Sequence, residues 1–103
     1  MIFIAADHAG YQLKEELKPY LKELGFEVED LGNEQLDPID DYPDFAYRLS
    51  HNVLDNQGSK GILICGTGQG MSIAANKTSG IRAALVYNEF TARIAAEHLN
   101  ANV

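Results

Sequence analysis

The chain has 103 residues, of which 46% are hydrophobic and 22% charged, and its 8 basic and 15 acidic side chains give a formal net charge of −7. This length corresponds to a single domain. Nucleic acids and anionic membranes attract proteins through clustered lysine and arginine, so the acidic balance and the lack of a basic run in the sequence argue against both partners.

Residues 1–6 form a short apolar run, which predicts a strand covered on both faces. The run lacks a basic leader and meets Asp7 and His8 too soon for a signal peptide. No apolar run approaches the roughly 18 residues that span a bilayer. The single cysteine, Cys65, excludes an internal disulfide and fits a reducing compartment. These features predict a soluble cytoplasmic protein.

A helix is predicted over residues 11–24, because leucines recur there at three- and four-residue steps between lysines and glutamates. Gly25 stands where a left-handed C-terminal cap belongs, and Pro19 inside the helix predicts a kink. Residues 26–31 predict a second, more exposed strand.

Residues 32–42 are polar, acidic and contain proline, so they predict a loop. The next helix starts near Pro43, which suits a first turn, and ends at Gly58. Its predicted buried stripe is Phe45, Leu49 and Val53.

Residues 61–65 predict a third strand, which is fully apolar. A loop with three alternating glycines, residues 66–70, connects it to a short helix over residues 71–77.

A fourth strand is predicted over residues 81–87, and Asn88 is expected to cap a last helix that ends at Leu99. The alternation of strands and helices predicts an α/β fold, a Rossmann-like three-layer α/β/α sandwich around a parallel sheet. Ligands of such sheets bind beyond the carboxyl ends of the strands. The segments that follow the first, third and fourth strands should therefore meet at one crevice.

The glycine loop has the composition of an anion-binding site. Alternating glycines let several backbone N–H groups point inward, and the following helix adds the partial positive charge of its N-terminus. The loop lacks the Gly-Lys-Ser/Thr of a P-loop, and its Gly-x-Gly-x-Gly spacing differs from the dinucleotide fingerprint. A nucleotide is therefore disfavoured, and the glycines alone fit a tight turn without a ligand equally well.

Cys65 ends the third strand directly before this loop. A lone cysteine at the end of an apolar strand is most often a small core residue. Beside a helix N-terminus, however, a thiolate is stabilised and can act as a base or nucleophile. The neighbouring amides could stabilise an oxyanion, and a base with an oxyanion hole is what proton abstraction next to a carbonyl requires.

The other polar residues leave two interpretations open. Asp7 and His8 follow the first strand, where they either cap the next helix or contact a hydroxylated or phosphorylated ligand. His98, on the last predicted helix, is by itself a histidine at the edge of the core. The cysteine and histidines lack metal-ligand spacing, so no metal site is predicted. The three arginines, Arg48, Arg82 and Arg93, are expected to form surface ion pairs.

Five segments of the sequence resemble the type B ribose-5-phosphate isomerases and the related galactose-6-phosphate isomerases. They are residues 6–10 (ADHAG), residues 41–44 (DYPD), residues 61–77 (GILICGTGQGMSIAANK), residues 80–83 (GIRA), and His98 with residues 100–102. The resemblance covers the whole chain in matching order and spacing. Residues 65–77 are its most specific part.

The resemblance implies an aldose–ketose isomerase that needs no metal or cofactor and interconverts ribose 5-phosphate and ribulose 5-phosphate through an enediolate. Cys65 matches the base that moves a proton between C1 and C2, Thr67 a residue that assists this transfer, and His98 the acid that opens the sugar ring. The implied substrate contacts are Asp7, His8, Gly66, Thr67, Gly68, Gln69 and Gly70.

The resemblance also implies a homodimer whose active sites use residues of both subunits, around a five-stranded parallel sheet. Family members continue through a fifth strand to a helical region with phosphate-binding arginines. We therefore expect residues 1–103 to form one isomerase domain with four strands and the start of a fifth, and with impaired activity. Leu99 stands where the family usually has Asn. The alternatives are a flavodoxin-like module that binds a sugar phosphate without catalysis, and an assembly subunit without a small-molecule ligand.

Overall fold

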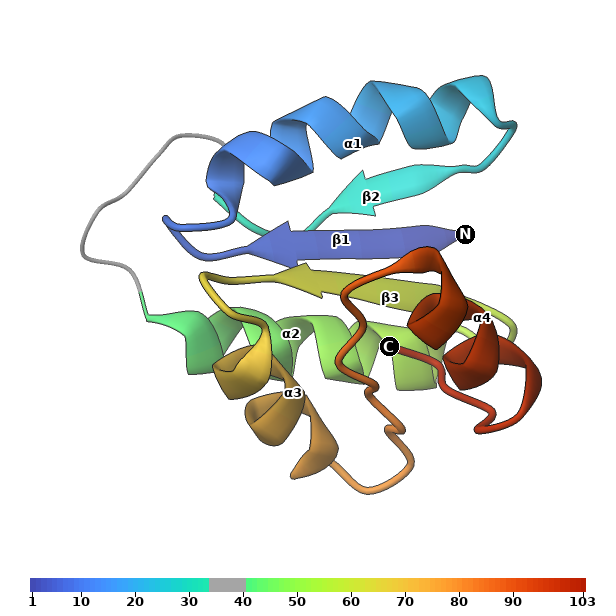
Figure 1. Cartoon of the computed structure of the whole chain (residues 1–103). Helices are drawn as coiled ribbons and strands as arrows, with labels where there is room; N and C mark the ends of the chain where they lie inside the picture. The colour runs from blue at the N-terminus through green and yellow to red at the C-terminus, as the bar shows by residue number, and fades with distance from the viewer. Residues whose placement is uncertain (34–40) are drawn as a thin grey trace.

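A parallel sheet lies at the centre of the computed structural model, which describes residues 1–33 and 41–103 (Figure 1). Its strands β1 (Ile2–Ala6), β2 (Val28–Asp30) and β3 (Lys60–Ile64) run in the order β2-β1-β3. The central position of β1 explains its composition: four of its five residues are buried, so none of them carries a polar side chain.

Helices cover both faces of the sheet, as the three-layer prediction required. They are α1 (Tyr11–Glu23), α2 (Tyr42–Asp55), α3 (Gln69–Asn76) and α4 (Glu89–Glu97). Figure 1 shows α1 on one side of the sheet and α2 and α3 on the other. In the part of the chain that the structure describes, no helix is long and apolar enough to cross a membrane.

The main hydrophobic core lies between the sheet and the α2–α3 pair. Alternate residues of β1, Phe3 and Ala5, meet the α2 stripe that the sequence predicted. That stripe and the buried residues of α3 are Phe45, Leu49, Val53, Met71 and Ala75. The predicted amphipathic pattern of α2 is thereby confirmed.

The helix ends also follow the sequence signals. Gly25 after α1 has a φ of 95°, in the left-handed region that favours glycine. At the start of α4 the Asn88 side chain accepts a hydrogen bond of 2.8 Å from the N–H of Thr91. Pro19 lies inside α1, which the structure describes as one helix. The predicted loop over residues 32–42 lies largely outside the described residues.

The predicted fourth strand is wrong: residues 81–87 form no strand. Two asparagine side chains bind the backbone groups that a neighbouring strand would otherwise pair. Asn76 donates to the carbonyl of Ala83 at 2.8 Å and accepts from its N–H at 2.9 Å. Asn102 accepts from the N–H of Arg82 at 2.8 Å. The sheet that the structure describes therefore has three strands rather than four and the start of a fifth.

Asn102 and Val103 lie between β3 and the segment that was predicted as a strand. The carbonyl of Asn102 accepts from the N–H of Gly61 at 2.9 Å, and the carbonyl of Val103 accepts from the N–H of Ala84 at 3.1 Å. Beyond Val103, a cavity of about 360 Å³ is lined by β3 residues on one side and residues 83–86 on the other. Because Asn102 and Val103 lie between the two segments, residues 81–87 do not form hydrogen bonds with β3 as a neighbouring strand would.

The leucine stripe predicted for α1 is only partly buried. Leu21 is buried, but Leu13 and Leu24 are 49% and 56% exposed, whereas Lys14 is completely buried. The Nζ of Lys14 lies 2.7 Å from Oδ2 of Asp30, and this ion pair explains why the side chain is buried. The attraction to such a partner offsets part of the desolvation cost that normally keeps lysine at the surface.

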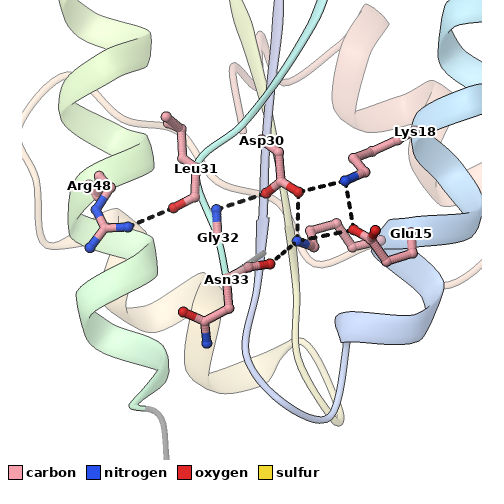
Figure 2. Close-up of polar contacts among 8 residues, drawn as sticks. Glu15, Lys18, Asp30, Leu31, Gly32, Asn33 and Arg48 are labelled. Atoms are coloured by element: carbon pink, nitrogen blue, oxygen red, sulfur yellow. Dashed lines mark hydrogen bonds and ion pairs between the residues drawn. The ribbon is translucent and has the colours of Figure 1, made fainter. Parts of the chain in front are cut away.

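Four charged residues form what we call the charge cluster: Lys14, Glu15 and Lys18 of α1, and Asp30 of β2 (Figure 2). The Nζ of Lys18 lies 2.8 Å from Oδ2 of Asp30 and 2.7 Å from Oε2 of Glu15. Burial would raise the pKa of the Asp30 carboxyl, but hydrogen bonds from Lys14, Lys18 and the N–H of Gly32 outweigh it and hold the pKa below its ordinary value.

Asp30 should make the stability of the fold depend on pH in the acid range. Because its folded-state pKa is depressed, its contribution is complete above the unfolded-state pKa and is lost as the pH falls through the folded-state pKa. Asp30→Asn should remove this part of the acid slope and lower the unfolding free energy at neutral pH by roughly 1–3 kcal/mol. Urea unfolding at a series of pH values from the acid range up to neutral measures both effects. Equal slopes in the two proteins would contradict the assignment.

Candidate active site

Cys65 follows β3 directly and lies at the carboxyl edge of the sheet, beside the turn into α3. The N–H of Gly68 points at its Sγ over 3.2 Å, and the thiol is half-buried. Gly68 is the residue before the first turn of α3 and has a φ of 81°. This left-handed conformation, which favours glycine, turns the chain so that its amide faces the sulfur.

The start of α3 adds further backbone donors next to Cys65. The first N–H groups of a helix have no partner within the helix and carry a partial positive charge. One of them, on Gln69, reaches the Oγ1 of Thr67 at 3.3 Å. The N–H groups of Gly70 and Met71 belong to the same helix end. The predicted loop therefore folds as an N-terminal helix turn of the type that binds anions.

The cavity described above opens beside Cys65, and we call it the Cys65 cavity. Cys65, Thr67 and Gly68 contribute to its lining, together with apolar side chains of α1 and α3. The sulfur is thus half-buried yet lies on the wall of a space of about 360 Å³. The residue that carries the thiol and the residue whose amide faces it therefore line the same cavity.

Asp7 occupies the same edge of the sheet and closes the turn before α1, a helix that starts without the side-chain cap that the sequence left open. Its buried carboxylate accepts hydrogen bonds from the N–H groups of Ala9 at 3.0 Å and Gly10 at 3.1 Å. Its own N–H donates to the carbonyl of Ile64 at 3.2 Å, which joins the ends of β1 and β3. The next residue, His8, has an exposed side chain. Both predicted substrate contacts therefore lie one strand away from Cys65.

His98 is not brought to Cys65 within this chain. It is the exposed residue that ends α4. Figure 1 shows the end of α4 near the start of β3, whereas the turn into α3 lies at the other end of that strand. A hydrogen bond from Lys60, the first residue of β3, to the carbonyl of Ala101 agrees with this placement.

Tyr42 lies beside the glycine loop, although no role was predicted for it from the sequence. It begins α2, and its ring lies so close to the glycine loop that a Cβ at Gly70 would come within 2.9 Å of two ring carbons. Its ring therefore covers the start of α3. The two residues are far apart in the sequence, and no periodic pattern links them. Only the resemblance over residues 41–44 could have drawn attention to Tyr42.

In the described part of the chain, the arginines contact residues outside the glycine loop. Arg93 forms the predicted surface ion pair, with Glu89 at 3.0 Å. Arg48 and Arg82 donate to backbone carbonyls, those of Leu31 at 2.8 Å and Leu99 at 2.9 Å. Among residues 1–33 and 41–103, no group of three or more His, Cys, Asp or Glu side chains is arranged to hold a metal ion.

Sequence comparison identifies close relatives. A family model described as Ribose/Galactose Isomerase matches residues 2–103. The probable ribose-5-phosphate isomerase B of Mycoplasma pneumoniae is 50% identical over 102 residues, which are 99% of this chain and 67% of that protein. Ribose-5-phosphate isomerase B of Mycobacterium tuberculosis is 42% identical, over 99% of this chain and 63% of its own length. The chain thus spans about two thirds of these relatives or slightly less.

Solved structures give the same picture. Ribose-5-phosphate isomerase B from Mycoplasma genitalium, crystallised with bound ribulose-5-phosphate, superposes with a TM-score of 0.94 at 51% identity, over 99% of this chain and 68% of that one. The Clostridium thermocellum protein gives a TM-score of 0.92 at 48% identity, over 98% and 68% of the two chains.

Replacing Gly68 by alanine should disturb the thiol as well as the fold. Gly68→Ala places a side chain at a positive φ and against Cδ1 of Leu85, so the amide facing Cys65 must move. Gly58→Ala is a matched control, because Gly58 has a φ of 85° and nothing within 4 Å of an added Cβ.

Both variants should lose about 1–2 kcal/mol through backbone strain. Gly68→Ala alone should slow alkylation of Cys65 by iodoacetamide about fivefold, as expected when one hydrogen bond of about 1 kcal/mol to the thiolate is lost. Alkylation rates on folded protein test this. Equal rates in the two variants would show that the Gly68 amide does not act on the sulfur.

Proposed function

The chain belongs to the ribose/galactose isomerase family, and from that premise we propose that its Cys65 site interconverts ribose 5-phosphate and ribulose 5-phosphate. The observation that carries the proposal is the 3.2 Å contact between the N–H of Gly68 and Sγ of Cys65 on the wall of the cavity. It combines a candidate base with oriented backbone donors. Aldose–ketose isomerisation needs both, because it removes a proton next to a carbonyl and forms a negative oxygen.

In this mechanism the Cys65 thiolate removes the proton from C2 of the open-chain aldose. The electron pair of the broken C–H bond forms the C1–C2 double bond of an enediolate, whose negative charge lies on the former carbonyl oxygen. Amides at the start of α3 stabilise that oxygen. The proton then returns from Cys65 to C1, and the hydroxyl of Thr67 assists the proton exchange between the two oxygens. The atoms and electrons of substrate and product balance without a redox partner.

The remaining residues bind the sugar phosphate. In this proposal Asp7 and His8 contact substrate hydroxyls from the end of β1, and Gly66, Gly68, Gln69 and Gly70 surround the reacting oxygens. The hydrogen bond between the ends of β1 and β3 supports this arrangement, because it fixes the position of Asp7 relative to Cys65. The substrate assignment is supported by the relatives, one of which was crystallised with ribulose-5-phosphate.

We further propose that two copies of the chain form a homodimer in which His98 of one copy serves Cys65 of the other. His98 is exposed and belongs to the opposite end of the sheet from Cys65, so a single copy cannot use both in one site. Tyr87 and Phe90, near the start of α4, are largely exposed aromatic side chains and could contribute to a dimer interface. A two-fold axis would create two equivalent shared sites.

Cys65→Ala should lower kcat for ribose 5-phosphate by about 10²–10⁴-fold, because it removes the base that transfers the proton. Binding of ribulose 5-phosphate, measured by calorimetry, should change little. A Cys65→Ala variant with undiminished kcat would contradict the proposed base. A wild-type protein that binds the sugar phosphate without turning it over would instead be the non-catalytic module.

Subunit mixing tests the shared site. Cys65→Ala and His98→Gln should each be nearly inactive, and a mixed dimer should contain one site with both residues intact. In an equimolar mixture about half of the dimers are mixed, so about a quarter of the wild-type activity should return after subunit exchange. Two inactive variants that stay inactive when mixed, with exchange shown by mass spectrometry, would contradict sharing between subunits.

A further inference from the structure

Lys14 is fully buried, and its ammonium group lies near three oxygen atoms of other residues. Its Nζ lies 2.7 Å from Oδ2 of Asp30, 2.7 Å from the backbone carbonyl of Asn33 and 3.3 Å from Oε2 of Glu15. The contacts with Asp30 and Asn33 are hydrogen bonds, and the longer contact with Glu15 is an ion pair. Through the contact with Asn33, Lys14 also binds the backbone that follows β2.

The chain just after β2 is held by groups of both neighbouring helices. Besides the contact of Lys14 with Asn33, Arg48 of α2 donates to the carbonyl of Leu31 at 2.8 Å (Figure 2). The N–H of Gly32 donates to Oδ1 of Asp30 at 2.9 Å. Each of residues 31–33 thus has one backbone group bound by a charged side chain.

This held segment lies against the end of β1 that carries the proposed substrate contacts. The N–H of Leu31 donates to the carbonyl of Ile4 at 2.8 Å. Gly32 packs so closely that a Cβ there would lie 3.0 Å from the nitrogen of Ala6 and 3.3 Å from its oxygen. Ala6 is the residue before Asp7, so a displacement of residues 31–33 would directly affect the backbone that leads into Asp7.

We propose that Lys14 is a positioning residue for the sugar-phosphate site: it holds residues 31–33 against the end of β1 and so fixes Asp7 and His8 relative to Cys65. The inference rests on the proposed function, because Asp7 and His8 are its substrate contacts. The hydrogen bonds and ion pairs of the Lys14 ammonium group described above go to Asp30, Asn33 and Glu15, none of which lines the Cys65 cavity or belongs to the glycine loop. Its effect is therefore on substrate binding and not on the proton transfer.

Lys18 provides a matched control. It belongs to the same charge cluster and forms ion pairs with Asp30 and Glu15. Within the described part of the chain, neither ion pair involves residues 31–33. Its side chain is also partly exposed. Removing Lys18 lowers the charge of the cluster by the same amount as removing Lys14, but leaves the bond to Asn33 in place.

The test compares KM and kcat for ribose 5-phosphate in Lys14→Met and Lys18→Met, at a temperature where both variants are folded. Lys14→Met should raise KM about 10–100-fold, the size expected when a hydrogen bond between the substrate and a charged group is lost, with kcat within about threefold of wild type. Lys18→Met should leave both constants within about twofold of wild type. An unchanged KM in Lys14→Met, or an equal rise in both variants, would overturn the proposal.

Arg48→Met keeps the proposal testable if Lys14→Met does not fold. Arg48 is exposed, so its removal leaves no buried charge, yet it releases the carbonyl of Leu31 from the same segment. It should raise KM in the same direction, and an unchanged KM would then overturn the proposal.

Hydrogen exchange separates this inference from the proposed function. Residues 31–33 should exchange their amide hydrogens faster in Lys14→Met or Arg48→Met than in Lys18→Met. If the wild-type protein does not isomerise ribose 5-phosphate, the proposed function fails. Exchange then still tests the contact itself, and equal exchange in all variants would refute it.

Discussion

The candidate site depends on one backbone hydrogen bond, from the N–H of Asp7 to the carbonyl of Ile64. It joins the carboxyl ends of two neighbouring parallel strands, and so places the residues after β1 beside Cys65. Gly10 reinforces the junction, because an added Cβ there would lie 2.6 Å from the carbonyl oxygen of Ile64. Only glycine lets α1 start this close to β3. The site is therefore a consequence of sheet pairing, and not of contacts between neighbouring residues in the sequence.

Three neighbouring parts of the structure contribute to the proposed chemistry. The strand end supplies the sulfur, the left-handed Gly68 aims an amide at it, and the start of α3 adds further donors. Lys14 acts from outside the site, through the segment that packs on Ala6. His98 lies at the far end of the sheet, and this separation is the physical reason for proposing that a second copy completes the site.

The sequence was most informative where local physics determines the structure. The spacing of Phe45, Leu49 and Val53 predicted the buried face of α2, and Gly25 and Asn88 predicted helix ends, because each signal depends on neighbouring residues only. The glycine spacing likewise predicted the turn beside Cys65. Residues 81–87 have a strand-like apolar pattern, but distant side chains such as Asn76 bind their backbone. The buried position of Lys14 was not predicted, because nothing in its helix indicates Asp30 as a partner.

The most direct test of the account is a crystal structure of the protein with ribulose 5-phosphate bound. The account predicts C1 and C2 of the sugar about 3–3.5 Å from Sγ of Cys65, with an oxygen of the sugar facing the amides at the start of α3. A sugar phosphate bound elsewhere, or bound with these carbons turned away from the sulfur, would contradict the assignment of Cys65 as the base.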